Sequence, residues 1–379
     1  MTYLEEEKVR SARLIFLMIA GAIGIMLLVI GVYQLVEFMD STSFCGELCH
    51  NVMYPEFTTF QASPHSRVTC SQCHVGSGAD YLVRSKLSGL PLVITTITGT
   101  YDRPIPTPVE NLRPARETCE QCHRPEIFLG DVVRVHTTFL QDEANTERVD
   151  TRILRIGGGE KEVARDIHWH IAAEVWYLPV DKQRQEITWV GVVDKNGDLT
   201  EYYDMDRVAE ASPERVQKEA RLMDCIDCHN RATHIFQSPE ELIDHAVVQG
   251  RINRSLPYIK REAMKALNTL SPSLEDAYRK VEAIEDFYRA SYPDVFQRQR
   301  AELASNIKVL KEIARLTTFP EMKVSWQTYN NEVSHIESPG CLRCHGKLIQ
   351  TTVGPQKDKP IRDDCQLCHY FQAGNAAAP

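Results

Sequence analysis

The segment Cys45-Gly46-Glu47-Leu48-Cys49-His50 places a histidine directly after a pair of cysteines, and the rest of the chain repeats this arrangement. Five further segments, each with two residues between the cysteines, lie at 70–74, 119–123, 225–229, 341–345 and 365–369. Cys-x-x-Cys-His is the attachment signature of c-type haem. The two thiols bond to the haem vinyl groups, and the histidine becomes an axial ligand of the iron. The sequence therefore predicts six covalently attached haems, around which the fold is organised.

The chain has 12 cysteines, and these segments use all of them. The predicted attachment residues are Cys45, Cys49, Cys70, Cys73, Cys119, Cys122, Cys225, Cys228, Cys341, Cys344, Cys365 and Cys368. Zinc sites and disulfides also use paired cysteines, but neither requires a histidine after every pair. Only 13 of the 379 residues are histidine, so chance does not explain the pattern. The first segment has three residues between its cysteines, and we assign it a haem because its thiols have no other partner.

The composition restricts the classes of function. The formal net charge is −9, which argues against nucleic-acid binding, since that requires a basic surface. An acidic surface is compatible with docking to a basic redox partner. Buried haems would also supply much of the apolar core, so long connecting loops are tolerable.

An apolar run at 14–36, LIFLMIAGAIGIMLLVIGVYQLV, precedes the first segment. It is long enough to cross a bilayer as a helix, and it exceeds the apolar part of a secretory signal. Lys8, Arg10 and Arg13 lie before it, and the next basic residue is Arg67. This asymmetry predicts a single-pass anchor in a bacterial cytoplasmic membrane, with the N-terminus in the cytoplasm and the bulk of the chain in the periplasm.

The pattern beyond the anchor predicts a mostly α-helical fold with irregular, haem-organised structure and one antiparallel β insertion. We expect an anchor at 1–38, a region with haems 1–3 at 39–130, the β insertion at 131–207 and a helical domain with haems 4–6 at 208–379. The insertion has no cysteine, and its β-rich runs end in a turn around Asn196-Gly197. An amphipathic pattern at 78–90 is consistent with a helix on the bilayer surface or one packed on haem.

The histidines supply candidate iron ligands. The expected proximal ligands are His50, His74, His123, His229, His345 and His369. The expected distal ligands are His65, His168, His170, His234 and His335. His168 and His170 lie in a predicted strand, where they would project from one face toward two neighbouring haems. Met53 is a further candidate beside His50 at haem 1, and the roles of His136 and His245 stay open.

The N-terminal third resembles the NapC/NirT family of membrane-anchored c-type cytochromes. The resemblance rests on the anchor followed by residues 43–55, on Ser63-Pro64-His65 and on the segment 70–75. It implies that haem 1 lies beside a quinol site and that Met53 is an iron ligand there. It also implies that Asp80 and Lys86 correspond to the acidic and basic residues of that site. The departures from the family pattern are one extra residue between Cys45 and Cys49 and one between His50 and Met53.

We therefore expect a hexahaem cytochrome that takes electrons from quinol, of the menaquinol type, and conducts them to a periplasmic or membrane redox protein. If it oxidises quinol directly, it is a quinol dehydrogenase. One alternative is an electron-transfer subunit of a larger respiratory complex. Another is a terminal reductase of nitrite or hydroxylamine, which would need an iron with an open position.

Overall fold

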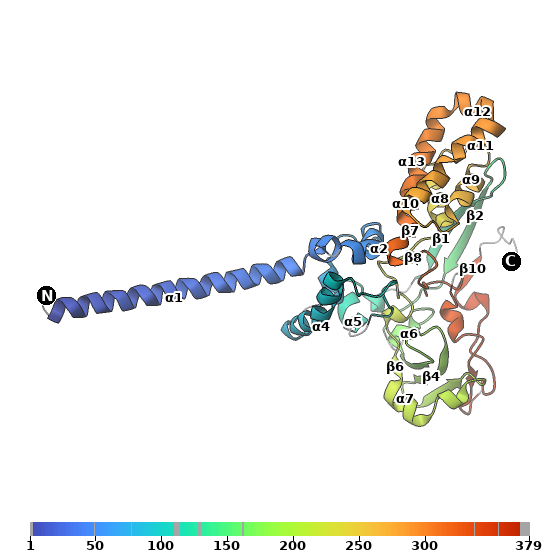
Figure 1. The fold of residues 1–379 in the computed structure, drawn as a ribbon. Helices are drawn as coiled ribbons and strands as arrows, with labels where there is room; N and C mark the ends of the chain where they lie inside the picture. The colour runs from blue at the N-terminus through green and yellow to red at the C-terminus, as the bar shows by residue number, and fades with distance from the viewer. Residues whose placement is uncertain are drawn as a thin grey trace.

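The computed structural model describes residues 3–48, 50–76, 78–109, 114–127, 130–160, 163–336, 338–354 and 356–371. Figure 1 shows one long N-terminal helix projecting from a body that contains a helical bundle and antiparallel sheets. Helices make up about 48% of the chain and sheets are present beside them, so the expectation of a mostly helical fold is met only in part.

The projecting helix, α1, spans Tyr3–Met39. Its part from Ala12 to Met39 is 28 residues long and is not buried against the rest of the chain. Within the described residues, this is the helix that is long and apolar enough to cross a membrane. A helix of this length spans roughly 42 Å, which exceeds the hydrocarbon core of a bilayer. The chain thus has the single-pass anchor that the sequence predicts.

Short helices follow the anchor and carry the first three cysteine segments. They are the π-helical turn η1 (Phe44–Leu48), α2 (His50–Gln61), α3 (Cys70–His74), α4 (Ala79–Thr98), α5 (Ala115–Cys119) and η2 (Pro125–Ile127). In α4, apolar side chains recur every three or four residues and are between 56% and 80% exposed: Val83, Leu87, Leu90, Ile94 and Ile97. We call these five residues the α4 stripe. Figure 1 shows α4 on the side of the body from which α1 leaves.

Two antiparallel sheets contain the predicted β insertion. The first has the order β1 (Val132–Phe139), β2 (Glu147–Leu154), β10 (His369–Phe371). The second has the order β6 (Arg221–Leu222), β3 (Glu174–Pro179), β4 (Ile187–Val193), β5 (Leu199–Tyr203), β9 (Ile349–Gln350). The predicted turn joins β4 to β5, and the Asp194 carboxylate accepts from the backbone N–H groups of Asn196 and Asp198. Strands from outside 131–207 complete both sheets.

The segment around His168 and His170 differs from the prediction. It forms no strand. His168 precedes a helical turn, α6 (Trp169–Ala172), which begins before β3. The carbonyl of His168 accepts from the backbone N–H of Ile171, so local turn bonds replace the strand pairing. The two histidines therefore do not share one face through strand alternation.

The helical region begins with α7 (Pro213–Glu219) and continues through α8 (Pro239–Val248), α9 (Ile259–Leu267), α10 (Leu274–Glu282), α11 (Ile284–Ser291), α12 (Pro293–Arg298) and α13 (Arg300–Thr317). A two-stranded sheet, β7 (Thr318–Phe319) with β8 (Val324–Ser325), and the short turn η5 (Pro320–Met322) follow. Ser212, Ser238 and Ser273 cap α7, α8 and α10 by accepting from backbone N–H groups with their hydroxyls. These serines satisfy donors that a helix start leaves unpaired, so each start agrees with its local sequence.

The body contains separate apolar cores. The bundle buries residues such as Ile243, Leu256 and Leu310 completely, each worth roughly 1.5–3 kcal/mol of transfer free energy. A smaller core joins Val52 of α2 to Phe319 at the end of the bundle. The helix nearest the anchor is thereby fixed to the C-terminal half of the chain.

Candidate haem-binding sites

We number the cysteine segments site 1 (45–50), site 2 (70–74), site 3 (119–123), site 4 (225–229), site 5 (341–345) and site 6 (365–369). Short helical turns carry them: η1, α3, the end of α5, η4 (Cys225–Asp227), η6 (Gly340–Arg343) and η7 (Cys365–Leu367). At sites 3, 4 and 5 the histidine N–H donates to the carbonyl of the first cysteine at 2.8, 2.8 and 3.1 Å. One turn of helix therefore brings both thiols and the imidazole to one locality, as covalent haem attachment requires.

Site 1 has its own local geometry. Its first cysteine lies in the π-helical turn η1, whose wider turn takes one residue more than an α-helical turn. This accommodates the extra residue between the cysteines. A Cβ placed on Gly46 would lie 2.2 Å from a ring carbon of Phe57, so only glycine lets η1 pack this closely on α2. Cys49 and the side chain of His50 lie outside the described part of the structure.

The structure brings motif histidines beside distant ones. The ring centres are 6.0 Å apart for His65–His123, 6.3 Å for His74–His234, 5.9 Å for His170–His345 and 6.3 Å for His335–His369. An imidazole nitrogen binds a metal at about 2 Å, so two imidazoles on opposite sides of one metal have ring centres roughly 6 Å apart. The four distances fit a six-coordinate iron held between two histidines.

We expect a fifth pair, His168 with His229, at site 4. Burial, and then the neighbouring His229 ring, lower the pKa of His168. His168 and His170 are thus placed at two successive sites, 4 and 5. The strand that we expected for these two histidines does not form, and their service to two different haems stays a prediction.

Hydrogen bonds orient several of these rings. Nδ1 of His170 donates to the carbonyl of Ile167 at 2.8 Å, and Nδ1 of His234 donates to the carbonyl of Glu56 at 2.9 Å. Nδ1 of His345 donates in the same way to the carbonyl of Arg362. A proton held on Nδ1 leaves Nε2 free to bind a metal. Burial also lowers the pKa of His234 to about 4, which keeps that ring in the neutral form that metals bind.

Contacts between thiols show which sites are neighbours. A hydrogen bond with Cys45 lowers the pKa of Cys70 to about 6, so sites 1 and 2 adjoin. Hydrogen bonding with Cys225 lowers the pKa of Cys119, so sites 3 and 4 adjoin.

The remaining neighbours follow from electrostatics. Burial, with a smaller contribution from Cys119, raises the pKa of Cys73, which places site 2 beside site 3. Burial and then Cys341 raise the pKa of Cys228 to about 12, and the same two causes raise that of Cys368. Site 5 therefore lies near both site 4 and site 6. The six segments succeed one another in space in the order of the chain.

Side chains within the motifs fasten sites 4 and 5 together. Asp227, between the cysteines of site 4, accepts from the Tyr177 hydroxyl at 2.6 Å and from Arg184 at 3.1 Å. Arg343, between the cysteines of site 5, donates to the backbone carbonyl of Asp227 at 2.6 Å and pairs with Glu332 at 3.4 Å. The relative position of these two sites is therefore set by buried charged groups.

The predicted quinol-site residues are only partly brought together. Lys86 on α4 pairs with Asp40, directly after the end of α1. Asp80 pairs with Arg84 of its own helix at 3.4 Å, and both side chains are exposed. Met53 lies half-buried on α2, one turn after His50. The structure thus ties Lys86 to the membrane end of the body and leaves Asp80 open to solvent.

Two histidines lie apart from these pairs, and a buried group of charged residues lies beside His234. His136 on β1 and His245 on α8 are exposed. Glu56, whose carboxylate is also a candidate acceptor for quinol protons, lies in a buried group next to His234 that the sequence did not predict, with an Arg231 nitrogen 3.9 Å from a Glu56 carboxylate oxygen. Burial raises the pKa of Glu56 to about 7 although Arg231 opposes this. The sequence shows a basic residue, Arg231, two positions after the site 4 histidine, but it does not show that Glu56 lies beside it.

Known proteins that are similar to this chain are c-type cytochromes. Residues 7–124 match the NapC/NirT cytochrome c family, N-terminal region. The chain is also 43% identical over 357 residues to the cytochrome c-type protein ImcH of Geobacter sulfurreducens, an alignment that covers 94% of this chain and 69% of ImcH. No solved structure matches.

Proposed function

The chain belongs to the NapC/NirT cytochrome c family, and we propose that it is a hexahaem member that conducts electrons from quinol to an extracytoplasmic redox protein. Family membership makes it a membrane-anchored c-type cytochrome of electron transfer with covalently bound haem c. We propose the number of haems, quinol as the electron donor and an extracytoplasmic redox protein as the acceptor.

One observation carries the proposal: four motif histidines each have a separate histidine partner with ring centres 5.9–6.3 Å apart, His168 lies near a fifth, His229, and neighbouring sites adjoin in chain order. Haem iron supplies one-electron chemistry, and two histidine ligands favour low potentials and electron transfer. The paired histidines of the chain would be the iron ligands of such groups. This arrangement suits conduction better than catalysis on a bound substrate.

We place the quinol end at site 1. Lys86 and Asp40 hold α4 against the end of α1, so the α4 stripe faces the region of the membrane surface. An apolar surface there would admit the tail of a quinol of the menaquinol type. Asp80, exposed at the start of α4, offers a carboxylate oxygen for a released proton. Met53 or His50 would supply the axial ligand at this site.

We place the exit at site 6. Figure 1 shows β10, which begins with His369, on the side of the body opposite α1. With the N-terminus in the cytoplasm, this end would face the periplasm and meet a soluble or membrane-bound acceptor. The path would then cross the whole body, from site 1 to site 6.

Menaquinol-driven reduction tests the proposal. We expect the full-length protein in lipid nanodiscs to contain six haems per chain and to be reduced by a menaquinol analogue without another protein. Near-infrared magnetic circular dichroism should count five irons with two histidine ligands. Reduction that requires an added membrane protein would overturn direct quinol oxidation.

A subunit of a larger complex is the second candidate. A Cβ on Gly21, Gly24 or Gly31 of α1 would meet no atom within 4 Å, so this face permits close approach of another helix. Stable co-purification with a second membrane protein in mild detergent would favour this alternative. A terminal reductase requires an open iron position, and on the proposed ligand assignment that position would lie at site 1.

A further inference from the structure

Arg231 carries a buried charge that the described chain does not fully pair. Its side chain is 10% exposed, and its Nη2 atom has no hydrogen-bond partner among the described residues. Its Nη1 atom is 3.9 Å from Glu56 Oε1, and Glu56 Oε2 also lacks a described hydrogen-bond partner. The spacing to Glu56 is wider than the close two-point contact that arginine and glutamate normally form, and Tyr329 is a further neighbour of the guanidinium, so Nη2 stays available to another acceptor.

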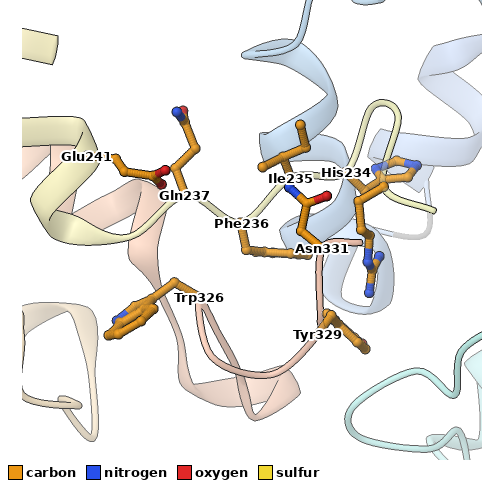
Figure 2. Close-up of a pocket in the computed structure, with 9 residues that line it drawn as sticks. His234, Ile235, Phe236, Gln237, Glu241, Trp326, Tyr329 and Asn331 are labelled. Carbon is orange, nitrogen blue, oxygen red and sulfur yellow. The ribbon is translucent and has the colours of Figure 1, made fainter. Parts of the chain in front are cut away.

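The surroundings fix the guanidinium and leave room beside it. Arg231 lies over the Tyr329 ring, 3.9 Å from its centre, which holds the planar group in one orientation. A cavity of about 200 Å³ adjoins it. Figure 2 shows His234, Asn331 and Tyr329 on one side of this cavity and Trp326 on the other. The cavity therefore joins an oriented guanidinium to a histidine that we assign as an iron ligand.

We propose that Arg231 binds a carboxylate, namely a propionate of the haem held by His74 and His234. A guanidinium fork matches a carboxylate with two parallel N–H donors, which would satisfy the free Nη2 atom. Haem c carries such carboxylates at its edge, and His234 lies three residues from Arg231 on the same segment. The inference rests on the proposed histidine pair at site 2.

The positive charge has a definite effect on this haem. A cation beside a haem propionate favours the reduced state, because reduction adds an electron to the group. Removing Arg231 should therefore shift the midpoint potential of one haem to a more negative value and leave the other five unchanged. Arg231 is in this sense a positioning and tuning residue, and it is not a ligand of iron.

Redox titration of holoprotein variants tests this. We expect Arg231→Gln to shift one of six midpoints downward and Arg231→Lys to shift it less. Arg148→Gln, which changes an exposed arginine on β2, should shift none. The propionate bending band in the resonance Raman spectrum should also change in Arg231→Gln. If all variants contain six haems with unchanged histidine ligation and neither midpoint nor band moves, the propionate assignment is wrong.

Two further experiments distinguish a haem propionate from the other possible partners of Arg231, which are Glu56 and an anion from solution. If Glu56 alone pairs with Arg231, the propionate bending band should be the same in the wild type and in Arg231→Gln, whereas a propionate partner predicts that the band moves, and moves equally in a Glu56→Gln background. If the anion comes from solution, added acetate or phosphate should move the wild-type midpoint and leave Arg231→Gln unaffected. Either result overturns the assignment. Loss of bis-histidine spectra in the wild type would instead refute the site 2 pair and the proposed function.

Discussion

Replacing His170 with alanine should open one iron, and only one. The His170 ring centre is 5.9 Å from that of His345, and its Nδ1 proton is held by Ile167, so Nε2 is the atom available to a metal at site 5. Each of the other four pairs contains different histidines. The variant should therefore convert one haem in six, about one sixth of the haem absorbance, from six-coordinate to five-coordinate.

Carbon monoxide binding measures this change directly, because ferrous haem with a free axial position binds the gas. We expect His170→Ala to bind one more carbon monoxide per chain than the wild type and to show a high-spin ferric signal in electron paramagnetic resonance. His168→Ala should do the same at site 4, and the double variant should bind two. His245→Ala, which changes an exposed histidine on α8, is the matched control and should bind none in excess.

Two outcomes would refute the reasoning. If His170→Ala keeps six haems but binds no additional carbon monoxide, His170 is not a ligand and the 5.9 Å spacing is only a packing contact. If the double variant frees one iron rather than two, the two histidines serve a single site. In that case the division of His168 and His170 between sites 4 and 5 is wrong.

Three further predictions follow from particular contacts. Asp227→Ala should lower the free energy of unfolding by about 3–5 kcal/mol, measured by chemical denaturation, because it leaves Arg184 and Tyr177 without their buried acceptor. Burial raises the pKa of Glu56 from 4.5 to about 7, so the native state keeps a proton that the unfolded chain releases. Stability should therefore fall as pH rises between these values, by on the order of 3 kcal/mol, and Glu56→Gln should flatten that change. A benzophenone amino acid at Ile94 of the α4 stripe should crosslink to phospholipid in proteoliposomes.

Matched controls decide each of these three cases. Asp198→Ala, at an exposed turn, should leave the free energy of unfolding nearly unchanged, and an equal loss in both variants would contradict the buried-acceptor argument. An unchanged pH profile in Glu56→Gln would assign the dependence to another group. The photoreactive group at Val149, exposed on β2, should not reach lipid, and protein crosslinks alone at position 94 would mean that the α4 stripe is covered by protein.

The anchor and the helix starts could be predicted because their causes are local. An apolar run of sufficient length and serines before proline each act within a few residues, as α1 and the caps of α7 and α8 show. The same locality explains the cysteine turns. Five of the six segments keep two residues between their cysteines, and one helical turn provides that spacing. Such features need no knowledge of the rest of the chain.

The predictions from sequence failed where contacts with distant segments decide the local structure. His168 and His170 occupy a helical turn because the backbone N–H groups of Ile167 and His168 donate to Arg155 and Ile156, at the end of β2, instead of to a strand partner. The sheets gain β6, β9 and β10 from segments 221–222, 349–350 and 369–371, which are too short to read as strands. The pairing of Arg231 with Glu56 joins residues 175 positions apart, so no local pattern reports it.

The histidine pairs also indicate how the chain is held together. His65, which precedes site 2, lies beside the histidine of site 3, and His234, which follows site 4, lies beside that of site 2. On the proposed ligand assignment, site 3 would be completed within the N-terminal region, whereas site 2 would need a residue from beyond the β insertion. The contact of Val52 with the core around Phe319 connects the same two parts of the chain. If His234 is the second ligand at site 2, as we propose, the membrane-proximal sites and the C-terminal half of the chain would depend on each other, because site 2 would be complete only when both have folded. In a haem path of this kind, a ligand that comes from a distant segment would fix the position of one haem site relative to another.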